Sequence, residues 1–444
     1  PTVRIAIFDE AHQLNETGVQ FLGKNITTSQ LLDFCRDLLG TGLQMARGLA
    51  DWQELAGKAE RAARELRLCV GKAHPGTKLR WTDACPETVD PEAWALALDQ
   101  MANAYSAAAE ALDTVSEIAP DFGRLLERAV EFGERLRHFA GPCQTGSVRW
   151  LEVGAQLRLI ESPLDIAQAV QAKVLGSNPE AAKTWIFTSA TLGDDDQLSW
   201  FTKPCGLVGA QLLRVGSPFD YASQAAVYVP RDFPKPSESA HMTRVAQSAA
   251  KWAARLGGRT MILTTTLRAL RGIADILRET FDASGELEVL VQGALPKRVL
   301  IERFRRGSSN GEAGCILVAS ASFWEGIDVP GDALQLVIID KLPFPPPNDP
   351  MAEARSKHIE SEGRSAFNDY FLPEAAVALK QGAGRLIRRE TDQGVLVVCD
   401  TRLVAMGYGK RLLKALPPMQ RLTTEAELLG RLDMLTKTCT TPSV

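Results

Sequence analysis

The feature that most constrains the fold of this 444-residue chain is the run Val-Arg-Ile-Ala-Ile-Phe at residues 3–8. This run is mostly apolar and rich in β-branched side chains, which is typical of a buried strand in a parallel sheet. It leads directly into Asp9 and Glu10, which therefore lie at the C-terminal end of the strand. Ligands of open α/β sheets bind at that edge. The sequence thus predicts an α/β fold with a site at the end of its first strand.

Two neighbouring carboxylates at such an edge suit phosphoryl-transfer chemistry. One can hold a Mg²⁺ ion that bridges nucleotide phosphates, while the other orients and deprotonates a water molecule. We assign Asp9 as the magnesium ligand and Glu10 as the general base. The alternative is that Asp-Glu after a strand is only a solvated turn, so the assignment needs support from further along the chain.

Composition excludes several classes of protein. Apolar residues make up 45% and charged residues 23% of the chain, as in ordinary globular proteins of about three domains. It has no run of about eighteen apolar residues and no apolar leader, so we expect a cytoplasmic protein without membrane partners. The net charge of −4 requires any nucleic-acid surface to be a local basic patch. The eight cysteines are scattered singly, so we expect reduced thiols and no metal site in this chain.

Helical periodicity dominates residues 28–140. Between residues 122 and 139, for example, apolar side chains recur every three or four positions, as on the buried face of a helix. We interpret 28–140 as an all-helical insertion, with a loop at 72–91 where prolines and a glycine gather. Strand signals return at 147–160 and 185–187, so the insertion separates two parts of one α/β domain.

Beyond residue 220, apolar strand runs alternate with helical patterns, which predicts a second α/β domain with a parallel sheet. Its expected strands are 261–263, 287–291, 315–319, 334–339 and 395–399. The predicted domains are 1–27 with 141–219, 28–140, and 220–444.

Two segments of the second domain place polar or aromatic groups just beyond predicted strands. Thr264 and Thr265 lie between a strand and a helix, where hydroxyl and N–H groups can hold a phosphate, although a helix N-cap is the commoner explanation. Residues 320–330 combine small, aromatic and acidic side chains. Their aromatic rings either stack on nucleic-acid bases or belong to the core.

The segment Gln-Gly-Ala-Gly-Arg-Leu-Ile-Arg at 381–388 is the most informative. Its two glycines let the start of a helix approach a ligand closely, and Arg385 and Arg388 lie three residues apart on one face of that helix. Guanidinium groups in such a place can neutralise charge on a transferring phosphoryl group. Exposed arginines on helices are usually only solvated, but the glycine context favours the functional interpretation.

Together these segments resemble, in order, the signature motifs of superfamily two helicases, and specifically of the XPD-like, DinG/YoaA-like bacterial branch. The long helical insertion is similar to the arch domain of that branch. The resemblance places motif II at residues 9–12, motif III at 189–191, motif IV at 264–266, motif V at 322–328 and motif VI at 381–388.

The resemblance implies two RecA-like lobes, the first incomplete here, and an ATP- and Mg²⁺-dependent motor that moves 5′ to 3′ along single-stranded DNA. Its DNA partners would be single strands and forked or 5′-tailed duplexes, and its protein partner would come from replication or repair. We expect a monomer. Carried over by motif, the residues at the nucleotide are Asp9 (Mg²⁺), Glu10, His12, Gly326, Asp328, Gln381, Gly384, Arg385 and Arg388. The residues that couple the nucleotide to DNA are Ser189, Thr191, Thr264, Thr265, Ser322, Trp324 and Glu325.

One departure from the family is clear. The family's phosphate-binding loop lies upstream of the acidic motif, and no Gly-x-x-x-x-Gly-Lys-[Ser/Thr] occurs in this chain. The four cysteines of the family's [4Fe-4S] cluster lie in the same upstream region. We therefore expect the chain to be the C-terminal part of the enzyme. Two alternatives stay open from sequence: a translocase that remodels complexes without unwinding, and an ATPase-dead nucleic-acid-binding module.

Overall fold

The computed structural model describes residues 3–175, 183–207, 209–308, 312–320, 323 and 329–439. The chain forms two units, which are described separately. The first contains Pro1–Phe187, Lys203–Val208 and Pro346–Arg364. The second contains Thr188–Thr202, Gly209–Pro345 and Ser365–Val444.

In the first unit, β1 (Ile5–Phe8) pairs in parallel with β6 (Thr184–Phe187). The parallel strand predicted before Asp9 is confirmed, but the prediction that it is buried is wrong. Ile5 is 59% exposed and Ile7 is 65% exposed. Among the described residues β6 is the only strand paired with β1. Exposed and half-buried residues alternate along both strands, so neither face of this small sheet is fully covered.

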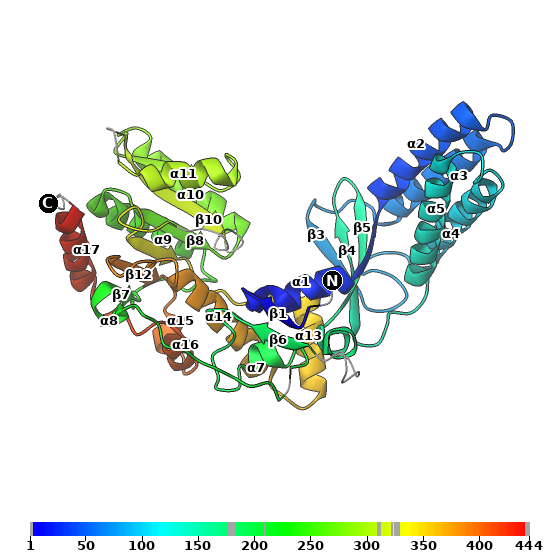
Figure 1. The fold of residues 1–444 in the computed structure, drawn as a ribbon. Coiled ribbons are helices and arrows are strands. Elements are labelled where there is room, and N and C mark those ends of the chain that lie inside the picture. The colour runs from blue at the N-terminus through cyan, green and yellow to red at the C-terminus, as the bar shows by residue number, and fades with distance from the viewer. Residues whose placement is uncertain are drawn as a thin grey trace. The chain divides into compact units, whose positions relative to one another are not determined.

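The predicted helical block contains four long helices that lie side by side (Figure 1). The spacing predicted for the last helix is confirmed, because Phe122, Leu125, Phe132 and Leu136 are all buried on one of its faces. Aspartates cap two of the helices, and a Thr-Gln capping box begins the first, as the helix N-terminus requires. The helices are α2 (Thr28–Met45), α3 (Trp52–Cys69), α4 (Pro91–Asp113) and α5 (Pro120–Ala140).

A second sheet accompanies these helices. Within the described part of the first unit it has four antiparallel strands, in the order β2 (Lys24–Thr27), β5 (Leu157–Pro163), β4 (Ser147–Val153) and β3 (Thr77–Trp81). The region 72–91, predicted as a loop, therefore contains a strand. β3 forms because it pairs with β4 and buries Trp81 against Trp94, at 5.2 Å between ring centroids. Both partners are distant in the sequence, so the local pattern does not reveal them.

Arg149 on β4 joins this sheet to the end of α5. Its side chain is buried, is paired with the buried carboxylate of Glu161, and donates to the carbonyl oxygens of His138 (2.8 Å) and Gly141 (2.6 Å). Its guanidinium also lies 5.3 Å from the ring centroid of Trp81. A buried charge with this many partners is fully compensated. The helices and the sheet therefore share one core.

The remaining elements of the first unit are short, apart from helix α13, which lies near residue 350, far from the others in sequence. This helix forms an ion pair with α1 through Arg355 and Glu16, at 2.7 Å. These elements are η1 (Ala11–Gln13), α1 (Leu14–Leu22), α6 (Ala167–Ala169), η2 (Val170–Leu175) and α13 (Pro350–Ser361).

The described part of the second unit is built on one sheet of seven parallel strands. All five predicted strands are present. The two strands that were not predicted are the short edge strand β13 and its neighbour β7. In spatial order the strands are β13 (Gln420–Leu422), β7 (Ala225–Tyr228), β12 (Gly394–Val398), β11 (Leu336–Ile339), β8 (Thr260–Thr264), β10 (Gly314–Ser320) and β9 (Leu287–Val291).

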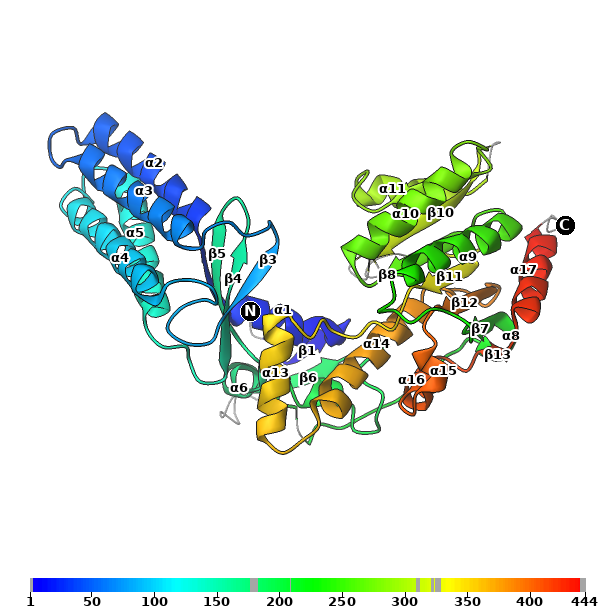
Figure 2. The same ribbon diagram turned by 180° about the vertical axis from the view of Figure 1, so that it is seen from behind.

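Helices cover both faces of this sheet, as a parallel sheet requires (Figures 1 and 2). Met261 and Leu263 of β8 belong to the same core cluster as residues of α11, α14 and α16, while Ile262 between them belongs to the cluster that includes residues of α9, α10 and α17. The helices are α7 (Ser199–Thr202), α8 (Tyr221–Gln224), α9 (Ala240–Leu256), α10 (Leu267–Phe281), α11 (Lys297–Arg306), η5 (Phe367–Phe371), α14 (Leu372–Ala383), α15 (Arg402–Ala405), α16 (Gly409–Ala415) and α17 (Glu425–Cys439). None of the described helices is both long and apolar enough to cross a membrane.

Candidate functional site

The acidic pair follows β1 directly, as the sequence predicts. Asp9 and Glu10 are both exposed, and the Glu10 backbone N–H donates to the Asp9 carboxylate at 2.9 Å. Glu10 has a φ of 50°, in the left-handed region that non-glycine residues rarely adopt. Such backbone strain is found at functional sites, where the surrounding structure holds it.

Glu10 also contacts His12, the third residue predicted in this segment. One carboxylate oxygen of Glu10 lies 3.3 Å from Nδ1 of His12, whose side chain is only 11% exposed. Ala11 between them is buried, so it anchors the turn. The first unit therefore gathers Asp9, Glu10 and His12 at the C-terminal end of one strand. Exposed carboxylate oxygens in this position suit a hard cation such as Mg²⁺.

In the second unit, two predicted segments meet although they are far apart in the sequence. The side-chain amide of Gln381 donates to the hydroxyl of Thr191 at 3.3 Å. Thr191 is 5% exposed, and its backbone N–H donates to the hydroxyl of Ser189 at 3.2 Å. Ser189, Thr191 and Gln381 thus form one polar group.

The segment that contains Arg385 and Arg388 has a different local structure from the one predicted. Helix α14 ends at Ala383, with Gly384 as its C-cap, so the glycines end a helix rather than start one. The interpretation that both arginines lie on one helix face is therefore wrong. They lie in the turn that follows α14, and both are half-buried.

A buried aspartate that the sequence analysis missed shapes this turn. Asp392 is 3% exposed and accepts from the backbone N–H groups of Arg388 (2.8 Å), Arg389 (2.9 Å) and Gly331 (3.1 Å). Leu386 anchors the turn as a buried apolar residue. The only sequence signal for Asp392 is an acidic residue in the short turn before a predicted strand, which does not by itself distinguish it from a solvated one.

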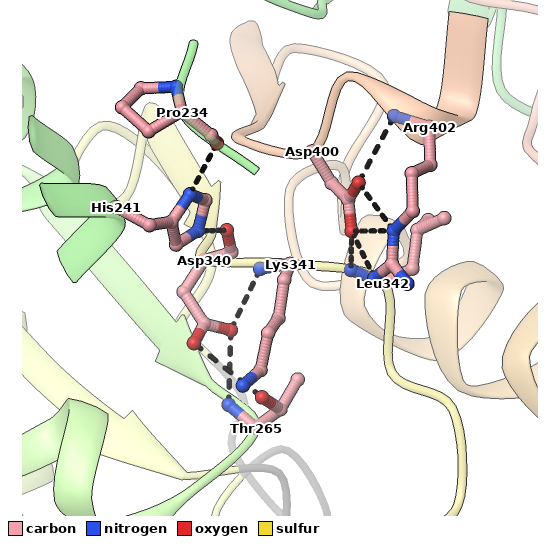
Figure 3. Close-up of polar contacts among 8 residues, drawn as sticks. All are labelled: Pro234, His241, Thr265, Asp340, Lys341, Leu342, Asp400 and Arg402. Carbon is pink, nitrogen blue, oxygen red and sulfur yellow. Dashed lines mark hydrogen bonds and ion pairs between the residues drawn. The ribbon is translucent and has the colours of Figure 1, made fainter. Parts of the chain in front are cut away.

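The two predicted threonines of motif IV have different environments. Thr264 is fully buried, and its hydroxyl lies 3.3 Å from the carbonyl oxygen of Ala319. Thr265 is half-buried, and its backbone N–H donates to the carboxylate of Asp340 at 3.0 Å (Figure 3). Thr266 caps α10 by accepting from the N–H of Ala269. Of the two predicted threonines, Thr265 is the one that is also open to solvent, and the capping residue Thr266 is exposed.

Asp340 follows β11 as Asp9 follows β1, and it is the centre of a buried polar network (Figure 3). The same carboxylate oxygen that accepts from Thr265 also accepts from the N–H of Lys341 at 2.8 Å. Both ring nitrogens of His241 lie 2.9 Å from a carbonyl oxygen, one of them that of Asp340 and the other that of Pro234. Sequence reasoning missed this network, since its partners come from four separate segments.

Beside it, Asp400 holds the chain that leaves β11. Asp400 is fully buried, accepts from the N–H of Leu342 at 2.9 Å and is paired with the guanidinium of Arg402 at 2.7 Å (Figure 3). Asp340 and Asp400 therefore fix the backbone at the C-terminal edge of the sheet, where Thr265 lies.

We expect Asp340 to make stability depend on pH. Burial raises the pKa of its carboxyl to about 6, against the lowering effects of Lys341, the N–H groups and His241. The folded state holds the Asp340 proton more tightly than the unfolded state does. The contribution of this proton to the free energy of unfolding is therefore complete below about pH 4 and is lost progressively up to about pH 6. Relative to Asp340→Asn, wild type should lose up to about 3 kcal/mol of unfolding free energy across this range. Urea unfolding of both proteins at several pH values measures the difference, and a constant difference would contradict it.

Most of motif V is outside the described residues. This applies to Ser322, Trp324, Glu325, Gly326 and Asp328. Phe323 between them is described and is 4% exposed, and the ammonium group of Lys297 lies 4.9 Å from its ring centroid. The core interpretation of this aromatic residue is therefore the correct one.

Known proteins are similar in sequence to this chain over nearly all of its length. The family described as helicase C-terminal domain matches residues 250–419. The ATP-dependent DNA helicase YoaA of Escherichia coli K12 is 36% identical over 422 residues, which are 95% of this chain and 63% of that protein. The ATP-dependent helicase DinG of Mycobacterium tuberculosis H37Rv is 33% identical over 294 residues, which are 65% of this chain and 43% of that protein.

Solved structures give the same fold. The chain covers 76% of S. tokodaii Xpd4 with a TM-score of 0.58 and 13% identity, and 94% of this chain is matched. A second structure, of an XPD helicase, has a TM-score of 0.54 and 15% identity over 95% of this chain. The chain spans about 63% of the length of the YoaA relatives.

Proposed function

We propose that this chain, which is similar in sequence to the YoaA and DinG helicases and in fold to XPD, acts in ATP-dependent unwinding of DNA. The observation that carries the proposal is the sequence similarity to YoaA across 95% of the chain. The hydrogen bond between Gln381 and Thr191 supports it, because it joins a predicted nucleotide-contacting segment to a predicted coupling segment.

In this proposal, the acidic end of β1 serves phosphoryl transfer. Asp9 would hold Mg²⁺, which neutralises charge on the nucleotide phosphates when it is bound. Glu10 would accept the proton of the attacking water, and its contact with His12 limits the orientations of its carboxylate. Gln381, Arg385 and Arg388 would contact the phosphates, with the arginines held by the turn that Asp392 organises.

The resemblance implies a [4Fe-4S] cluster, and its four cysteines are not expected among those of this chain. The described part of the chain has no group of three or more His, Cys, Asp or Glu side chains able to hold a metal ion.

The polarity, the DNA substrates and the cellular role are further parts of the proposal. We propose movement 5′ to 3′ on single-stranded DNA, action on forked or 5′-tailed duplexes, and a role in repair or replication with a protein partner. The domain boundaries 1–27 with 141–219, 28–140 and 220–444 stay a prediction, with residues 28–140 as the DNA-gating arch. The core that the helices share with β3–β5 supports treating the helical block as separate from the seven-stranded sheet.

An unwinding assay tests this function. The protein expressed from its complete gene should separate a 5′-tailed duplex in the presence of ATP and Mg²⁺, and a duplex with a 3′ tail should stay paired. Separation of only the 3′-tailed duplex would contradict the polarity. ATP hydrolysis stimulated by single strands without any strand separation would instead identify a translocase.

The 444 residues expressed alone should not show DNA-stimulated ATP hydrolysis. Phosphates need a cradle of backbone N–H groups and a lysine for in-line attack by water, and no phosphate-loop motif occurs in these residues. Positioning supplies most of phosphoryl-transfer catalysis, so Asp9 and Glu10 alone are not sufficient. A colorimetric phosphate assay with and without single-stranded DNA checks this. Stimulated turnover that disappears in Glu10→Gln would show that the site is complete without such a loop.

A further inference from the structure

A small pocket lies entirely within the second unit. Its volume is about 100 Å³, and its walls come from α14, α16, the segment just after Thr191 and the chain near Arg214. A single water needs roughly 10–15 Å³ of such volume, so the pocket has room for an ion of several heavy atoms.

Three cationic side chains line this pocket, namely Arg214, Lys380 and Lys414. The one acid in its wall, Asp194, is already neutralised. Both Asp194 carboxylate oxygens accept from the guanidinium of Arg411, at 2.5 and 3.1 Å, and the Asp194 side chain is only 6% exposed. This bidentate pair is the strong form of a carboxylate–arginine interaction, so Asp194 has little capacity left for the three cations.

The three cations have no charged partner of their own in the described part of the chain. Neither Lys380 nor Lys414 forms an ion pair there, and Arg214 donates to the carbonyl oxygen of Asp195, which is an uncharged acceptor. The nearby Asp195 carboxylate instead accepts from the N–H groups of Gln197 and Ser199. The pocket therefore concentrates positive charge.

Lys380 is the most constrained of the three. It is half-buried on the last turn of α14, and its carbonyl oxygen accepts from the N–H of Gly384 at 2.9 Å, which fixes its backbone. Burial, followed by the positive charge of Arg214, lowers the pKa of its ammonium group. An anion in the pocket would raise the pKa of Lys380 again, because its negative charge stabilises the ammonium group and offsets the positive charge of Arg214.

We propose that this pocket is a binding site for one phosphate group, held by the ammonium groups of Lys380 and Lys414 and by the guanidinium of Arg214. A tetrahedral oxyanion has several acceptor oxygens for the cationic donors that line the pocket, and the volume is too small for a whole nucleotide. A phosphodiester of a nucleic-acid backbone and a free phosphate ion present the same chemistry. In the sequence, Lys380 directly precedes Gln381, and the pocket residue Gly193 follows Thr191 by two positions.

Titration with inorganic phosphate, followed by calorimetry, tests the site in the 444-residue chain. Lys380→Gln and Lys414→Gln should each weaken phosphate binding by about tenfold or more, as expected when a charge-assisted hydrogen bond is lost. Lys410→Gln is the matched control, because Lys410 is exposed on the same helix as Lys414 and does not line the pocket. Equal phosphate affinity in all four proteins, or an equal loss in the control, would overturn the proposal. Urea unfolding midpoints confirm that the variants are folded.

The source of the phosphate is distinguished with a single-stranded oligonucleotide. If a backbone phosphodiester fills the pocket, the Lys380 and Lys414 variants should reduce the slope of log affinity against log salt concentration by about 1, and the control should not. If the slope is unchanged while phosphate binding is weakened, the occupant is a free phosphate. The phosphate titration needs neither ATP nor unwinding, so its outcome is independent of whether the proposed helicase function holds.

Discussion

Glu10→Gln abolishes DNA-stimulated ATP hydrolysis while ATP binding persists, if Glu10 is the general base. Glutamine keeps the size and one acceptor oxygen of glutamate but has no basicity, so the attacking water keeps its proton. The protein expressed from its complete gene is the appropriate sample. Steady-state phosphate release gives the turnover, and equilibrium binding of a fluorescent ATP analogue gives the affinity.

His12 gives a matched comparison for this experiment. Its ring contacts the Glu10 carboxylate at 3.3 Å, so it acts by positioning rather than by accepting the proton. His12→Asn should therefore lower turnover by less than Glu10→Gln and leave a measurable rate. Hydrolysis near the wild-type rate in Glu10→Gln would show that another group is the base, and loss of ATP binding would show that Glu10 holds the nucleotide instead.

Arg388→Ala lowers ATP turnover by on the order of 10³-fold, the magnitude expected when a charge-stabilising arginine is removed from phosphoryl transfer. The turn fixed by Asp392 presents its side chain, and the backbone N–H of Arg388 is held at 2.8 Å from that carboxylate. Arg388→Lys should restore only part of the rate, since an ammonium group lacks the planar, bidentate geometry of a guanidinium.

Arg389 provides the control, because it is the next residue in the same turn and its side chain is exposed. Arg389→Ala removes the same charge and should keep turnover within a few-fold of wild type. Equal effects of the two substitutions would point to loss of the turn or of net charge. Turnover near wild type in Arg388→Ala would end its assignment as a phosphate-contacting residue.

The hydrophobic pattern was sufficient to predict the seven-stranded sheet in outline. Its central strands, such as β8 and β10, are buried on both faces and therefore read as continuous apolar runs. Strand β13 has only three residues, and β3 depends on pairing with β4, so neither has a clear local signal. The exposure of β1 was also not predicted, because an apolar run does not reveal whether other elements cover the faces of its sheet.

Candidate site residues that directly follow strands were predicted from the sequence. The buried residues that hold the backbone around them were not predicted. Asp9 and Thr265 were predicted from their positions after strands. Asp340 and Asp392 were not, since they act by accepting backbone N–H groups from segments far away in the sequence. The helix was predicted to begin at the glycines before Arg385, but it ends there. A Gly-x-Gly pattern suits the end of a helix as well as its start.

Arg149 has a consequence for how this architecture can be rearranged. The helical block is an insertion in the linear order of the chain, yet the guanidinium of Arg149 is satisfied by carbonyl groups at the end of α5, such as that of Gly141, and by Glu161 in the sheet. A chimaera whose exchanged helix ends at a different position or angle would move these carbonyl oxygens away from the buried guanidinium. The smallest segment that can be exchanged between relatives without a buried-charge defect therefore includes the β4–β5 hairpin together with the four helices.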